Sequence, residues 1–125
     1  MKTSFLWCMV IVLLLAGAAA AHPPKEVKID FDPDSKMLMV TAIHDTKDVT
    51  KHYVGMVQVD LNGEKMIEQK FKSQVGPGEQ MAHFWINDAK VGDTLTVTAF
   101  CNIAGKKQAS LKIEKKAETA PMKMD

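Results

Sequence analysis

Arginine is absent from this chain, and cysteine nearly so. All 16 basic residues are lysines, they are set against 15 acidic residues, and the only cysteines are Cys8 and Cys101. A chain without arginine lacks the planar guanidinium group that binds phosphate bidentately, and a nucleic-acid-binding surface would also need an excess of basic residues. Because both are missing, nucleic acid is excluded as an expected partner.

The two cysteines cannot build the disulfide framework that many small exported proteins use. Cys8 lies in an N-terminal apolar segment that we expect to be removed, which leaves Cys101 without an intramolecular partner. The fold must therefore be held by an ordinary apolar core. Cys101 itself is a buried apolar side chain, a reactive thiol or a metal ligand.

The N-terminal segment has the layout of a secretory signal peptide. Lys2 supplies a positive charge, residues 5–15 form an apolar run, and residues 16–21 are mostly small. The run is too short for a membrane span, although an uncleaved anchor is the alternative. We expect a periplasmic or secreted protein with no stable membrane insertion. The expected organisation is a signal peptide at 1–21, one domain at 22–114 and a flexible tail at 115–125.

After the signal peptide, apolar residues alternate with polar ones, which predicts strands and no helix. The alternation is clear in residues 25–32 and 94–101, and residues 36–43 are apolar on both faces, as in a central strand. The strand expected at 53–61 should place its odd-numbered residues, starting with Tyr53, on one face. Asn62-Gly63 is typical of a type I′ hairpin turn. The pattern predicts an all-β, immunoglobulin-like antiparallel β-sandwich of about seven strands.

The order of the loops predicts where candidate ligands lie, because loops between successive antiparallel strands fall alternately at the two ends of a sandwich. Counting from the polar loop at 44–52 places five residues at one end: His22, His44, His52, His83 and Cys101. Imidazole and thiolate together suit iron, copper or zinc better than calcium or magnesium. The sequence therefore predicts a transition-metal site there. The alternative is solvated loop histidines and an inert, buried thiol.

Two stretches, K-H-Y-V-G-M-V-Q-V-D-L-N-G at 51–63 and A-F-C-N-I-A-G at 99–105, resemble the superoxide reductase family, the iron domain of neelaredoxin and desulfoferrodoxin. The resemblance covers most of the expected mature chain. It implies an immunoglobulin-like sandwich with a mononuclear non-haem iron, held by four equatorial histidines and one axial cysteine. His44 and His52 look like two of these histidines, and Cys101 looks like the axial ligand.

The chain departs from the family pattern at three points. The spacing between His44 and His52 is two residues longer than usual. Ala104 stands where the family has a ligand histidine in C-N-x-H-G, and His22 in A-A-H-P-P lacks the glutamate and lysine of the family's E-K-H-x-P motif. The resemblance therefore implies a degenerate metal site, in which His22 and His83 are the candidates for the vacant positions.

Three functions are compatible with these residues. The resemblance implies an oxidoreductase that reduces superoxide to hydrogen peroxide with electrons from an unidentified donor. The lysines that could attract this anion are Lys47, Lys51, Lys106 and Lys107. The alternative is a non-catalytic metal-binding or interaction module on the same scaffold. In the third, His22 is a free N-terminus that chelates copper, with Met122 and Met124 as soft ligands.

Overall fold

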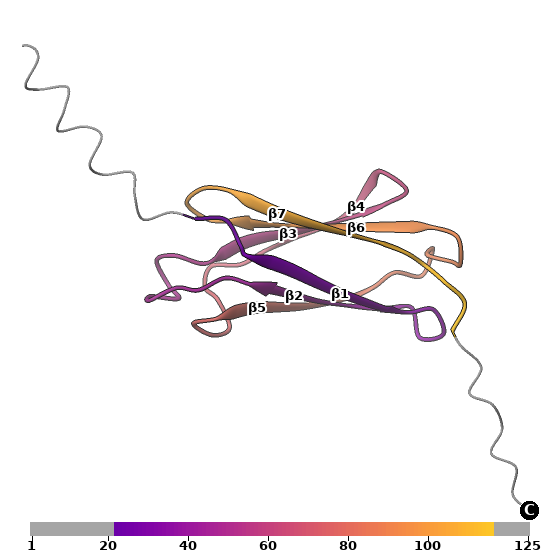
Figure 1. Cartoon of the computed structure of the whole chain (residues 1–125), viewed down its shortest axis with the longest axis horizontal. Coiled ribbons are helices and arrows are strands. Elements are labelled where there is room, and N and C mark those ends of the chain that lie inside the picture. Colours follow the sequence, from indigo (N-terminus) through magenta and orange to yellow (C-terminus); the bar gives the residue numbers. More distant parts are fainter. Residues whose placement is uncertain (1–21, 117–125) are drawn as a thin grey trace, which may run out of the picture.

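Seven strands form two sheets that pack face to face (Figure 1). The computed structural model describes residues 22–116, and the strands in this range are β1 (Glu26–Asp32), β2 (Met37–Ile43), β3 (Val54–Leu61), β4 (Glu64–Lys70), β5 (Glu79–Trp85), β6 (Thr94–Cys101) and β7 (Lys106–Lys112). The first sheet has the order β1-β2-β5 and the second the order β4-β3-β6-β7, with antiparallel pairing throughout. The predicted all-β, immunoglobulin-like sandwich is confirmed.

The described range leaves out the predicted signal peptide at 1–21, with Cys8, and most of the predicted tail, with Met122 and Met124. Within residues 22–116 the chain forms no helix, so this part of it contains none that could cross a membrane. The domain boundaries expected at 22–114 stay a prediction.

The core lies between the two sheets and is built from the apolar residues that alternate along each strand. Leu38 of β2, in the first sheet, is fully buried. So are Val59 of β3 and Leu95 and Val97 of β6, the two central strands of the second sheet. Burying one such side chain contributes about 1.5–3 kcal/mol. The core therefore supplies the stability that disulfides supply in many exported domains of this size.

A bulge at the start of β3 corrects one prediction. The pairing of β3 with β6 shifts between Val54 and Met56, so Val54 is fully buried and Tyr53 is only half-buried. Tyr53 therefore does not share the buried face of Val57, because the shift inserts one residue into the alternation. The predicted hairpin after β3 is as expected, since Asn62 and Gly63 have the φ angles of 51° and 84° that a type I′ turn requires.

One end of the sandwich gathers segments that are far apart in the sequence. The start of β1, the loop after β2 and the turn after β6 all lie at this end (Figure 1). Two contacts tie them together: the Asn102 amide donates to the Tyr53 carbonyl at 2.8 Å, and Gly105 lies against Pro23. This end of the fold carries the candidate site.

Candidate metal centre

Three imidazole rings meet at this end: His22 before β1, His44 directly after β2, and His52 shortly before β3. Their ring centroids are 4.6–4.9 Å apart, and one nitrogen from each ring lies within 4.8 Å of the others. Metal–nitrogen bonds of about 2.0–2.1 Å would place ligand nitrogens roughly 3–3.5 Å apart, which is closer than this upper bound. The three rings therefore form a candidate site, in which a bound ion would draw the nitrogens together.

A buried glutamine fixes the tautomer of His44. The Gln74 side-chain amide donates to the carbonyl oxygens of His44 at 2.7 Å and Gly76 at 2.8 Å, so its Oε1 must be an acceptor. That oxygen accepts from the Val54 amide at 3.1 Å and from His44 Nδ1 at 2.9 Å. The proton of a neutral His44 therefore sits on Nδ1, and the lone pair sits on Nε2.

The Nε2 atom of His44 has an environment that suits a cation. Its neighbour is the carbonyl oxygen of His22 at 3.2 Å, and His44 itself is fully buried. A carbonyl oxygen cannot donate a hydrogen bond to a lone pair. A metal ion bound at Nε2 would give this lone pair a partner.

One ring nitrogen of His52 lacks a hydrogen-bond partner among the described residues. This nitrogen, Nε2, is buried. Burial lowers the pKa of His52, and repulsion from His44 and His22 lowers it further. The ring is therefore neutral near pH 7, with an unsatisfied nitrogen whose isolation costs about 1–3 kcal/mol. A metal ion would satisfy it, so the residues present fit a metal.

Asn102, the residue after Cys101, holds the chain on both sides of His52. Its Oδ1 accepts from the Tyr53 amide at 2.8 Å, and its Nδ2 donates to the Lys51 carbonyl at 3.0 Å. The backbone of β3 can approach so closely because position 55 is glycine: a Cβ on Gly55 would lie 3.1 Å from that of Asn102. Asn102 therefore helps to orient His52, while Cys101 before it carries the thiol.

Cys101 is buried at the end of β6, where it pairs with Val54, two residues after His52. Its Sγ faces Asn102 Oδ1 at 4.0 Å, and it is not a member of the three-histidine cluster. Of the three residues predicted to converge, His44 and His52 lie together, joined by His22, whereas Cys101 lies on the neighbouring strand end outside this cluster.

His22 is held in place by the turn after β6. Pro24 is fully buried, and Gly105 packs so tightly on Pro23 that a Cβ there would lie 2.8 Å from the proline side chain. Gly105 also has a φ of 89°, which a residue with a side chain rarely adopts. Ala104, immediately before it, is exposed. The turn that carries Ala104 therefore abuts the segment that carries His22.

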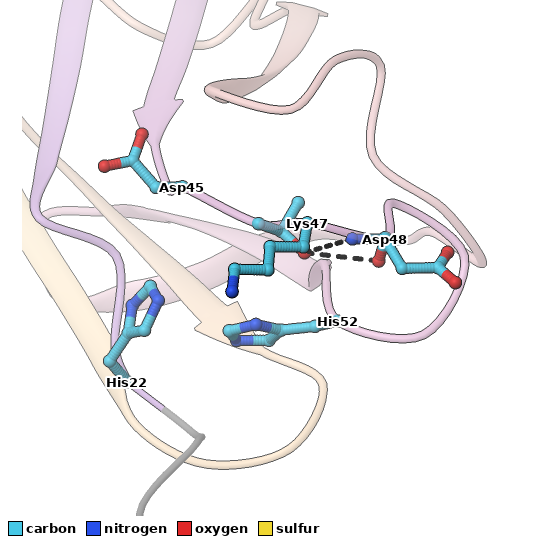
Figure 2. Close-up of a pocket in the computed structure, with 6 residues that line it drawn as sticks. His22, Asp45, Lys47, Asp48 and His52 are labelled. Atoms are coloured by element: carbon cyan, nitrogen blue, oxygen red, sulfur yellow. Dashed lines mark hydrogen bonds between the residues drawn. The ribbon is translucent and has the colours of Figure 1, made fainter.

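A pocket opens onto the rings of His22 and His52 and is closed on its other side by the loop after β2. Figure 2 shows Lys47 extending its amine toward the two rings. The carboxylates at the pocket are engaged elsewhere: Lys25 pairs with Asp45 and lowers its pKa, and hydrogen bonds from Thr50 lower that of Asp48. Lys47 is thus the cation best placed to meet an incoming anion.

The other predicted residues lie elsewhere. His83 is exposed on β5, paired with Met39, on the outer face of the first sheet and outside the cluster. Of the four lysines expected to attract an anion, Lys51, Lys106 and Lys107 do not line the pocket. Gln74 was not anticipated, because a single polar residue between two strands gives no signal in the sequence.

Comparison with solved structures shows a likeness in fold. The superoxide reductase (1Fe-SOR) from Giardia intestinalis has a similar structure, with a TM-score of 0.56 and 16% sequence identity, over 74% of this chain and 100% of that one. No family model matches the sequence, and no curated protein does. At this identity the likeness shows the fold alone: the chain has a superoxide-reductase-like β-sandwich, with a three-histidine cluster at one end that could hold a metal.

Proposed function

We propose that this protein binds one mononuclear non-haem iron through His22, His44 and His52, with Cys101 as a fourth ligand, and that it reduces superoxide to hydrogen peroxide. The observation that carries the proposal is the cluster of three imidazoles with ligand nitrogens within 4.8 Å of one another, to which His52 contributes a ring whose Nε2 is buried without a hydrogen-bond partner among the described residues. The likeness in fold to a superoxide reductase supports the choice of iron and substrate.

Each residue has a separate task in this proposal. Bound iron would supply the electron that superoxide needs. Gln74 keeps the Nε2 lone pair of His44 free, Asn102 orients His52, and the lowered pKa of His52 keeps its ring neutral for binding. Lys47 attracts the anion to the pocket by its charge. The electron donor is a separate partner of unknown identity.

A second candidate function is a non-catalytic zinc or copper site. It is favoured by the cluster itself, because three imidazoles and a water complete a tetrahedral zinc site without Cys101. In this case Cys101 would be a buried apolar side chain, as its position in the strand also allows.

Three measurements on the purified native protein distinguish the two candidate functions. They are metal analysis, the visible spectrum and a stopped-flow assay of superoxide decay. Iron with a thiolate charge-transfer band that is lost in Cys101→Ala, together with superoxide consumption, supports the first. Stoichiometric zinc or copper without superoxide consumption overturns it in favour of the second. Protein that binds none of the three metals contradicts both.

Ala104→His should tighten iron binding and accelerate the reaction with superoxide. Ala104 is exposed in the turn that abuts the segment of His22, so a histidine there adds an imidazole near the cluster. We expect about a tenfold gain in affinity, the lower end of the effect of altering a metal environment. Ile103→His, one position earlier in the same turn, is the matched control. Equal affinity and rate in wild type and Ala104→His would show that a missing ligand does not limit the site.

The remaining expectations are proposals as well. We propose export to the periplasm or the cell exterior after removal of residues 1–21, and a domain spanning residues 22–114 followed by a tail at 115–125. N-terminal sequencing of the exported protein tests the first, and limited proteolysis tests the second.

A further inference from the structure

The outer face of the first sheet carries a group of sulfur and imidazole side chains that the three-histidine cluster does not use. Met39 of β2 and Met81 of β5 are 45% and 44% exposed, and His83 of β5 is exposed between Met81 and Trp85. All four residues alternate with buried neighbours, so they point away from the core.

The register of the two strands brings three of these side chains together. Met39 pairs directly with His83, and Met81 lies two residues before His83 on the same face. Directly paired residues have Cβ atoms about 4.5–5.5 Å apart, and residues two apart on a strand are separated by about 7 Å. Methionine has three rotatable bonds, so both thioethers can close over the imidazole of His83.

We propose that Met39, Met81 and His83 form a second metal site, one for a soft monovalent cation such as Cu(I). Two thioethers and one imidazole form a ligand set that favours Cu(I), whereas zinc and ferrous iron prefer nitrogen, oxygen or thiolate ligands. This site therefore favours a softer metal than the iron proposed for the three-histidine cluster. The proposal is independent of the function proposed for the cluster.

Access to this site is open. β5 is an edge strand of its sheet, and His83 and Met81 also border a shallow depression at that edge, next to Gln69 of β4. Trp85 follows on the same face, paired with Met37 and 67% exposed. An ion bound at His83 would lie beside this indole ring, which provides a fluorescent reporter.

Titration of the full chain with Ag(I), a redox-inert substitute for Cu(I), tests the site when each methionine methyl group is labelled with ¹³C. We expect the methyl resonances of Met39 and Met81 to shift with saturation at one equivalent, and the fluorescence of Trp85 to be quenched. Met66 of β4 is similarly exposed, at 40%, and its resonance should not move.

Anaerobic competition with a Cu(I) chelator then gives the affinity. The double variant Met39→Leu/Met81→Leu, which keeps size and apolarity but removes both sulfurs, should bind Cu(I) about tenfold or more weakly with an unchanged Tm. Met66→Leu is the matched control, and His44→Ala should keep the quenching of Trp85. Unchanged affinity in the double variant, or methyl shifts confined to Met122 and Met124 of the tail, would overturn the proposal.

Discussion

His52→Ala should abolish high-affinity metal binding and leave the metal-free protein about as stable as the wild type. The two effects separate because His52 Nε2 is buried without a hydrogen bond among the described residues, so its removal relieves a cost. We expect a loss of metal affinity of about 100-fold or more. The free energy of unfolding without metal should change by no more than about 1 kcal/mol.

Isothermal titration with ferrous iron and zinc, and urea unfolding in the presence of a chelator, measure the two quantities. His83→Ala is the matched control, because it removes the same side chain from the outer face of the sheet. It should leave affinity at the cluster unchanged. A destabilisation of His52→Ala by several kcal/mol without any loss of affinity would show that His52 is a packing residue and not a ligand.

Gln74→Leu should destabilise the protein by about 4 kcal/mol or more and weaken metal binding as well. Gln74 is 4% exposed, and its side chain makes four hydrogen bonds: to Nδ1 and the carbonyl of His44, to Val54 and to Gly76. Leucine satisfies none of these groups, and each buried group left without a partner costs about 1–3 kcal/mol. It also releases His44 Nδ1, so the ring is no longer held with its lone pair on Nε2.

Gln80→Leu is the control for this prediction. Gln80 is also buried, at 5% exposure, but its two hydrogen bonds go to the backbone of Val75 and Met81 and to none of the clustered histidines. Gln80→Leu should destabilise the protein less than Gln74→Leu does and leave its metal affinity unchanged. Long-range ¹H–¹⁵N spectra of the metal-free proteins distinguish the roles further, because only Gln74→Leu should change the tautomer of His44. If that tautomer is unaltered, Gln74 is merely a structural residue.

Most of the fold followed from local signals in the sequence. Period-two alternation and the Asn62-Gly63 turn are properties of neighbouring residues, and they specify strands and a hairpin without knowledge of the tertiary structure. The bulge at Val54 could not be predicted in this way. It lies where Gly55 packs against Asn102, which is almost fifty residues away in the sequence.

The site was predictable in part. Loop order predicted that His22, His44 and His52 lie at one end, because it depends only on the number of strands. The number of strands does not indicate which face of a sheet a residue occupies, so loop order also grouped His83 with them. The alternation of buried and exposed residues in β5 places His83 on the outer face, with Met81. Gln74 and Asn102 act through hydrogen bonds to distant backbone, which no sequence pattern reveals.

The cluster spans the two layers of the sandwich. His44 follows β2 of the first sheet, whereas His52 leads into β3 of the second, and His22 leads into β1. The three rings can therefore meet only after the sheets have docked. A bound ion would therefore link the two layers and stabilise their docked arrangement. Because the complete ligand set exists only in the docked sandwich, metal binding and docking of the two layers should be thermodynamically coupled.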